Sequence, residues 1–155
     1  MDEPRSLISD EVRAMIGSEA APRSFVVDPV VGRRLAEALG EDPEAIAGSE
    51  FAPSFYFSAY ESFIPPTGIA GELASGVLAG DEWEQLRPLR WGERIVSTGR
   101  IADIYERFGG RHGQTLYLRY EWRFTDEQGE PVAVSRRVFA RYATGAGGAS
   151  DEEAP

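Results

Sequence analysis

The chain has 155 residues, of which 42% are hydrophobic and 27% charged, and this composition suits one globular domain with its own core. All 16 basic residues are arginine, and the chain contains no cysteine, no lysine and a single histidine. Chemistry that needs a thiolate, a Schiff-base lysine or a P-loop lysine is therefore excluded for this chain. One histidine without cysteine leaves too few ligands for a His-rich or thiolate site, and we predict no metal.

The charge is unevenly distributed along the chain. The net charge of −10 argues against nucleic acid as a partner, since phosphates require a basic face. Residues 1–86 carry a net charge of −11, residues 87–142 carry +4, and residues 143–155 carry −3. The second half could therefore hold a small anionic ligand, although a solvated arginine face explains the same balance.

The ends of the sequence predict location and boundaries. No apolar run approaches the roughly 20 residues that span a bilayer, so we expect no membrane span. The acidic stretch MDEPRSLISDEV lacks the positive flank and apolar stretch of a secretory signal, which predicts a cytoplasmic protein. We expect a disordered N-terminus over residues 1–7, a single domain over 8–142 and a flexible acidic tail over 143–155.

The first predicted helix is short. Ser9 or Asp10 is its expected N-cap, Val12 and Ile16 are expected to point inward, and Gly17 is expected to end it.

A better-marked helix follows a short strand predicted over residues 24–27. Asp28 is a good N-cap, Pro29 suits the first helical position and Gly40 suits the C-terminal end. One apolar stripe at i, i+4 and i+8 is expected to face the core: Val31, Leu35 and Leu39. A brief helical turn is predicted next, over residues 42–48.

Residues 52–64, APSFYFSAYESFI, contain five aromatics and almost no polar face. This pattern predicts a central helix that is buried on most sides, with Ser54 as its cap and Pro65-Pro66 as its end. A glycine-rich connection over 67–75 is expected to follow it.

Strands are predicted over residues 76–89, 94–105, 114–125 and 131–142, with Pro88 at an edge or a bulge. The third alternates polar residues with one apolar face: Leu116, Leu118, Tyr120, Trp122 and Phe124. Short glycine-bearing links join the last three strands into an antiparallel meander. Helices followed by a long antiparallel sheet predict an α+β domain, with the sheet wrapped around the central apolar helix.

This order of elements resembles the hot-dog fold, and more narrowly the MaoC-like or FAS1-like dehydratase N-terminal domain. Four motifs over residues 8–142 carry the resemblance: Ile16-Gly17 leading into Phe25-Val26-Val27 and the helix end Ala38-Leu39-Gly40-Glu41-Asp42; Ala52-Pro53-Ser54-Phe55, similar to the family's Ala-Pro-Pro-Thr-Phe; the EQLRPLRWGE strand turn from Glu84 to Glu93; and the hairpin from Tyr117 to Val132.

The resemblance implies hydration of a trans-2-enoyl thioester, or dehydration of a 3-hydroxyacyl thioester. Coenzyme A or acyl carrier protein would carry the acyl group, with no other cofactor. Active members of the wider group use an aspartate and a histidine in the loop before the hot-dog helix, which activate water and deliver a proton to the α-carbon. A backbone N–H at the helix start binds the thioester oxygen.

This sequence departs from that pattern at the histidine. The loop over residues 40–54 contains Asp42 but no histidine, so the chain lacks the implied dyad. The single histidine, His112, falls in a predicted hairpin between two glycines, a position that is usually exposed to solvent. Two alternatives stay open: His112 reaches an active site across a subunit interface, or Glu61 serves as the base.

Five residues are candidates for substrate binding. Tyr56 and Tyr60 lie at i, i+4 on the central helix and could line an acyl tunnel, although filling the core explains them as well. Arg87, Arg90 and Trp91 could bind the phosphates and adenine of coenzyme A, because arginine binds phosphate bidentately and tryptophan stacks. Snorkelling arginines at a strand edge are the alternative.

The resemblance and the missing histidine together predict the non-catalytic, substrate-binding half of an (R)-enoyl-thioester hydratase or 3-hydroxyacyl-thioester dehydratase in lipid metabolism. A lone hot-dog sheet exposes a strand edge and half a tunnel, so we expect pairing with a MaoC-like catalytic subunit, or a homodimer. The alternatives are an acyl-CoA thioesterase that uses Glu61 and a non-enzymatic module that binds acyl thioesters.

Overall fold

The computed structural model describes residues 6–59, 73, 75–109 and 113–143, and the structural statements below refer to these residues. Short helices come first and long strands later, as expected. In chain order the elements are α1 (Asp10–Ala14), β1 (Arg23–Val26), α2 (Pro29–Leu39), α3 (Pro43–Gly48), β2 (Phe51–Ala52), the 3-10 helix η1 (Ser54–Ala59), β3 (Ser75–Gln85), β4 (Leu89–Arg90), β5 (Arg94–Arg107), β6 (Thr115–Asp126) and β7 (Pro131–Tyr142).

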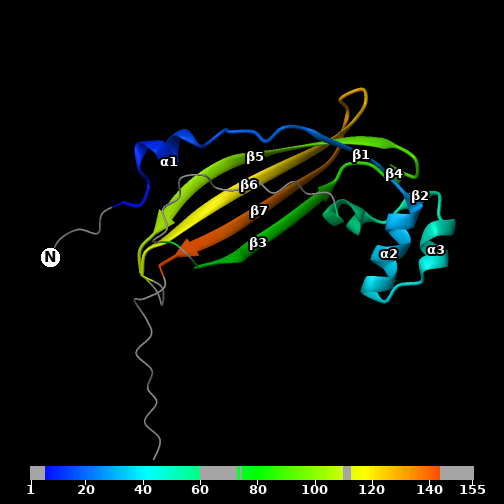
Figure 1. Ribbon diagram of the computed structural model, residues 1–155, viewed down its shortest axis with the longest axis horizontal. Coiled ribbons are helices and arrows are strands. Elements are labelled where there is room, and N and C mark those ends of the chain that lie inside the picture. The colour runs from blue at the N-terminus through cyan, green and yellow to red at the C-terminus, as the bar shows by residue number, and fades with distance from the viewer. Residues whose placement is uncertain (1–5, 60–72, 74, 110–112, 144–155) are drawn as a thin grey trace, which may run out of the picture.

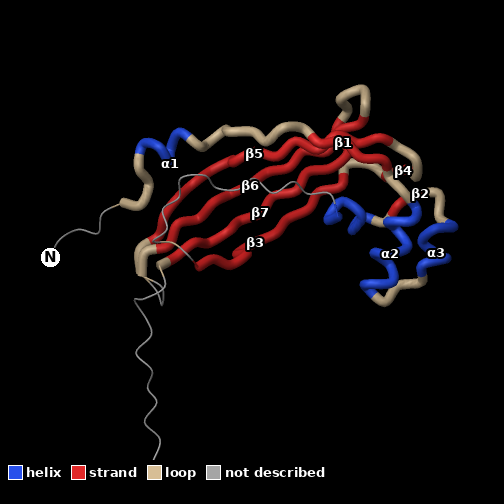
Figure 2. The backbone as a smooth tube through the Cα atoms, viewed as in Figure 1, coloured by secondary structure: helices blue, strands red, loops and turns tan. Residues whose placement is uncertain are grey.

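Five antiparallel strands form one sheet in the order β1-β5-β6-β7-β3, and β2 pairs with β4 in a small separate ladder. The meander of β5, β6 and β7 is confirmed. The long strands lie side by side in a curved sheet, with α2 and α3 at one end and α1 near the other (Figure 1). The tube view shows the same curvature along all four long strands (Figure 2).

The core lies on one face of this sheet. The alternation predicted for β6 is confirmed, because its apolar face is at most 1% exposed: Leu116, Leu118, Tyr120, Trp122 and Phe124. Phe57 of η1 packs on this face, with its ring centroid 4.8 Å from that of Phe124 and 6.1 Å from that of Trp83 on β3. Phe57 therefore covers this part of the core face.

The predicted N-caps of α1 and α2 are confirmed, whereas Ser54, predicted to cap the central helix, is the first residue of η1. The side chains of Ser9, Asp28 and Asp42 accept hydrogen bonds from backbone N–H groups in the first turns of α1, α2 and α3. Gly40 ends α2 in the left-handed conformation, with φ of 75°. Among the described residues no helix is long and apolar enough to cross a membrane.

Two residues expected to point inward do not. Val12 is buried, but Ile16 is 38% exposed because α1 ends at Ala14 and the helical period stops there. Leu39 is 60% exposed, at the last turn of α2. Val31 and Leu35 do pack against the core, as predicted.

The segment predicted as a central helix begins differently from the prediction. Ala52 belongs to strand β2, where it pairs with Leu89, and the helix starts at Ser54 as a 3-10 turn. Residues 60–64 of the predicted helix lie outside the described residues, as do residues 1–5 and 144–155 of the predicted disordered N-terminus and flexible tail.

One buried hydroxyl in the core has no hydrogen-bond partner among the described residues. Ser97 Oγ on β5 is fully buried on the core face, opposite Phe124. Because an unsatisfied hydroxyl costs desolvation energy, Ser97→Ala is expected to raise the free energy of unfolding by about 1 kcal/mol. Urea denaturation measures this change, and a loss of stability would show that the hydroxyl has a partner.

Candidate substrate-binding site

Four predicted site residues lie within the described residues, and the structure brings them to one end of the sheet. Tyr56 of η1 contacts Trp91, and Arg87 and Arg90 flank the same β4 turn. The helices α2 and α3 lie at this end of the sheet, beside β4 (Figure 1). The other three candidates, Tyr60, Glu61 and His112, lie outside the described residues. Their predicted roles therefore stay predictions.

Tyr56 is fully buried, and its hydroxyl joins two elements. The hydroxyl oxygen accepts a hydrogen bond from the backbone N–H of Asp28 at 2.6 Å and lies 3.2 Å from the Asp28 carbonyl, to which it donates. Asp28 is also the N-cap of α2, so Tyr56 attaches η1 to the start of that helix. This contact gives the tyrosine the polar partner that a buried phenol requires.

Trp91 lies in the turn after β4 and contacts three elements. Its indole N–H donates to the Ser49 carbonyl at 2.9 Å, and its ring meets Tyr56 edge-on with centroids 5.8 Å apart. The ring also covers Gly32 of α2 so closely that an added Cβ would come within 2.5 Å of it. Trp91 is thus wedged between α2, the end of α3 and η1.

Arg90 lies at the exposed rim of this region. Its guanidinium pairs with Glu50 at 2.6 Å and stacks over the Phe51 ring, 5.0 Å from the centroid. About two thirds of both charged side chains is exposed, so water screens this pair. An anionic ligand could replace Glu50 here at little cost.

Arg87 is more tightly engaged than Arg90. Its guanidinium forms a two-pronged ion pair with Glu93 and reaches Asp126, the last residue of β6, at 3.1 Å. The Glu93 carboxylate also accepts the backbone N–H of Arg90 at 3.1 Å. Arg87 therefore ties the β4 turn to the β6–β7 hairpin, and binding a phosphate would require it to leave both carboxylates.

The Arg87 ion pairs give a prediction for pH. Hydrogen bonds from Arg87 hold the pKa of Glu93 below its ordinary value, against burial, which acts to raise it. A carboxylate with a depressed pKa stabilises the fold above its unfolded pKa, near 4.3 for glutamate, and this stabilisation is lost as pH falls through the folded-state value. Arg87→Met is expected to cost about 1 to 2 kcal/mol at pH 7 and progressively less below about pH 4.3.

Urea denaturation of the unsubstituted protein and of Arg87→Met at pH 7, 5 and 3 measures the difference in their free energies of unfolding. Arg94→Met is the matched control, because Arg94 makes a single, half-exposed pair with Glu127. A cost for Arg87→Met that is the same at pH 3 and pH 7 would contradict the assignment.

Asp42, the aspartate of the loop expected to carry an acid–base dyad, caps a helix. Asp42 Oδ1 accepts hydrogen bonds from the backbone N–H groups of Glu44 and Ala45, at 3.0 and 3.3 Å, as the N-cap of α3. Within the described ranges no three acidic, histidine or cysteine side chains gather as a possible metal site. The described contacts give Tyr56, Trp91 and Arg87 structural roles, and their part in substrate binding stays a prediction.

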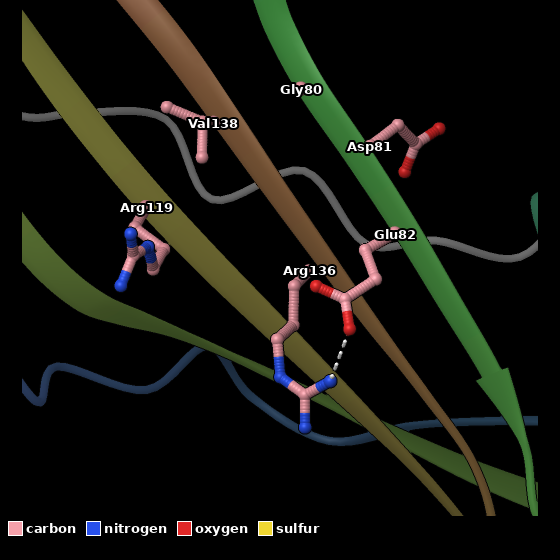
Figure 3. Close-up of a pocket in the computed structure, with 6 residues that line it drawn as sticks. All are labelled: Gly80, Asp81, Glu82, Arg119, Arg136 and Val138. Carbon is pink, nitrogen blue, oxygen red and sulfur yellow. Dashed lines mark hydrogen bonds and ion pairs between the residues drawn. The ribbon is translucent and has the colours of Figure 1, made fainter.

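Sequence reasoning missed a second polar region, on the opposite face of the sheet. There the Glu121 carboxylate forms ion pairs with three arginines: Arg100 at 2.8 Å, Arg123 at 3.0 Å and Arg136 at 3.4 Å. Arg136 also pairs with Glu82, at 3.3 Å. Beside it lies a hollow of about 400 Å³, shown in Figure 3 with the bond between Arg136 and Glu82 dashed and Arg119 across from them. The alternation of β6 predicted that its polar side chains share one face. Which residues of β7 and β3 lie beside them depends on the register of those strands, which the sequence alone does not give.

Comparison with known proteins places the chain in a family. Residues 14–135 match the family model described as the FAS1-like dehydratase domain region. No curated protein matches the chain.

Solved structures with the same fold share little sequence with this chain. A chain of the ChsH1–ChsH2 complex from Mycobacterium tuberculosis superposes with a TM-score of 0.65 at 17% identity, covering 87% of this chain and 91% of that one. A chain of the HadBC (3R-hydroxyacyl-ACP dehydratase) complex from the same organism gives 0.59 at 17% identity, covering 81% and 96%. The MaoC-like dehydratase from Rhodospirillum rubrum gives 0.55 at 15% identity, covering 84% and 94%. The chain therefore has the hot-dog fold and belongs to the family of the FAS1-like dehydratase domain region.

Proposed function

We propose that this chain is the non-catalytic, substrate-binding half of a heteromeric (R)-enoyl-thioester hydratase or 3-hydroxyacyl-thioester dehydratase. Its partner would be a MaoC-like chain that supplies the aspartate and histidine. The substrate would be an acyl thioester of coenzyme A or of acyl carrier protein. Lipid metabolism and the cytoplasm stay predictions for its setting.

The observation that carries the proposal is the absence of a catalytic pair where the family would need one. The chain has a single histidine, at position 112, and none in the loop over residues 40–54. The aspartate of that loop, Asp42, caps α3. A general acid and base must be within hydrogen-bond reach of the same substrate atoms, so a second chain has to supply them.

The edge of the sheet supports pairing with a second chain. Strand β3 pairs with β7 on one side only, among the described residues, and leaves an edge 11 residues long. Val77 and Leu78 on this strand are each 50% exposed. A long edge with exposed apolar side chains is a template for another strand.

Two of the similar solved structures support the proposal that the chain works in a complex of two chains. The ChsH1–ChsH2 and HadBC structures are both described as complexes, and the second is described as a 3R-hydroxyacyl-ACP dehydratase. At 17% identity these structures share only the fold with this chain, so the reaction and the two-chain assembly enter here as part of the proposal.

The proposal is tested by co-expressing this chain with a MaoC-like chain that carries the Asp/His pair and is encoded by a neighbouring gene. Sizing of the purified sample reports assembly, and the change in absorbance of crotonyl-CoA reports hydration. We expect a stable pair that hydrates crotonyl-CoA, and no hydration by this chain alone.

Three results would overturn the proposal. Appreciable hydration by the chain alone would show that it has its own catalytic groups. Thioester hydrolysis that Glu61→Ala abolishes would assign a thioesterase. Binding of acyl-CoA with no change in any partner's activity would assign a binding module.

A further inference from the structure

One ion pair lies on the core face of the sheet, among large apolar side chains. Arg137 of β7 lies opposite Tyr120 of β6 on one side and opposite Asp81 of β3 on the other. Residues directly opposite in antiparallel strands share a face, and Tyr120 belongs to the buried face of β6. The Arg137 guanidinium pairs with the Asp81 carboxylate at 3.2 Å, and its Cζ atom lies 5.9 Å from the centroid of the Trp122 ring. We call Arg137 and Asp81 the core-face ion pair.

The preceding residue of β7 serves the opposite face of the sheet. Arg136 pairs with Glu82 and Glu121 on the outer face. Figure 3 shows Asp81 leaving β3 on the side away from Glu82 and Arg136. Of these two neighbouring arginines, therefore, Arg137 is the one that can reach a ligand on the core face.

Stability gives little reason for a charged pair in this position. Taking charged groups out of water costs energy that a single ion pair recovers poorly, and apolar side chains of similar size often serve a core as well. The pair is also not sealed inside the core, because 23% of the Arg137 side chain and 34% of the Asp81 side chain are exposed. An arginine held by a carboxylate and a tryptophan ring has already lost much of the side-chain freedom that binding a ligand would cost.

The core-face ion pair lies where the second chain of the proposed complex would meet this one. Asp81 is in the middle of the edge strand β3, and Leu78, on the core face of the same strand, is half exposed. A substrate that receives its acid and base from the partner must lie within reach of both chains. Arg137 offers such a substrate a positive charge beside the middle of this edge.

The proposed reaction develops negative charge at one atom of the substrate. When water adds to the β-carbon of an enoyl thioester, the electron pair of the double bond moves to the thioester oxygen, which becomes an enolate. The partner's base takes a proton from the water, and its acid gives a proton to the α-carbon, which returns the electron pair from the oxygen. Dehydration passes through the same enolate in reverse. Donors and positive charge placed at that oxygen lower the barrier, and an arginine stays charged throughout.

We propose, on the basis of the proposed function, that the Arg137 guanidinium donates hydrogen bonds to the thioester oxygen and stabilises the enolate that forms there. Asp81 and Trp122 are positioning residues, because they hold the guanidinium. This chain then supplies neither acid nor base, but it binds the oxygen on which the charge develops. The partner transfers the protons.

Variants of the assembled pair test this role, with crotonyl-CoA as the substrate and the partner chain at a saturating concentration. Arg137→Ala should lower kcat for hydration by about 100-fold and change KM by less than about threefold, since the lost contact strengthens in the transition state. Arg137→Lys keeps the charge without the planar fork and should lose less. Guanidinium ions at millimolar concentration should restore part of the activity of Arg137→Ala.

Arg136→Ala is the matched control, because Arg136 is also an ion-paired arginine of β7 but lies on the outer face. It should keep the rate of the unsubstituted pair, and guanidinium ions should not raise that rate. Full activity of Arg137→Ala in an assembled pair would overturn the proposal, as would a loss confined to KM.

A second measurement does not depend on turnover. Butyryl-CoA is a saturated thioester that cannot be hydrated, and an isotopic label at its carbonyl carbon makes the infrared stretch of the bound carbonyl visible. Hydrogen bonds from a guanidinium polarise the carbonyl, so we expect a lower frequency in the unsubstituted pair than in Arg137→Ala. An unchanged frequency would overturn the contact. A lower frequency in a pair that hydrates no enoyl thioester would support the contact and overturn the proposed function.

Discussion

Trp91→Ala is expected to lower the free energy of unfolding by about 3 kcal/mol. The indole lies between Gly32, Tyr56 and Ser49, so its removal leaves a cavity between α2 and the β4 turn. The substitution also leaves the Ser49 carbonyl without its donor. Urea denaturation followed by circular dichroism measures the loss.

Two related variants sharpen this prediction. Trp91→Phe keeps most of the packing and loses the hydrogen bond, so it should cost about 1 kcal/mol. Gly32→Ala forces a methyl group against the same ring and should cost about 1 to 3 kcal/mol. A Trp91→Ala variant as stable as the unsubstituted protein would mean that the helices at this end of the sheet are held by other contacts.

Leu78→Lys is expected to weaken the assembly with a catalytic partner at least about 30-fold. Leu78 is half exposed on the edge strand β3, where a lysine opposes the addition of another strand. Because the residue is already half exposed, the stability of the chain alone should change by less than about 1 kcal/mol. The dissociation constant of the purified pair measures the effect.

Leu39→Lys is the matched control for this prediction. Leu39 is 60% exposed at the end of α2, away from the β3 edge, so the same change of side chain there should leave the assembly intact. If Leu39→Lys weakens the pair and Leu78→Lys does not, the partner binds the helical end of the molecule instead of the sheet edge.

Local signals in the sequence predicted a large part of the fold. Helix caps depend on one side chain and the backbone next to it, so Asp28 and Gly40 marked the ends of α2 correctly. Strand β6 was predicted from its alternation alone, because burial of one face imposes a period of two. Both rules act over a few residues and need no knowledge of the rest of the chain.

Features that depend on distant residues were missed. The buried residues of α2 are Gly32 and Ala36, and the ring that covers Gly32 is that of Trp91, far along the chain. The apolar stripe alone extended the buried face wrongly to Leu39. Arg87 was a candidate for phosphate because no local pattern indicated that Asp126 would fold back onto it. The pairing of β3 with β7 is likewise a property of the whole sheet.

The central claim, that this chain binds substrate while its partner supplies the catalytic pair, is tested most directly on the assembled pair. Glu61→Gln and His112→Ala are introduced together into this chain, and the rate of crotonyl-CoA hydration is measured against pairs in which the partner's catalytic aspartate or histidine is replaced. We expect the doubly substituted chain to support hydration within about twofold of the unsubstituted pair, and the partner variants to lose at least about 100-fold. A comparable loss from Glu61→Gln and His112→Ala, in a pair that still assembles, would contradict the claim.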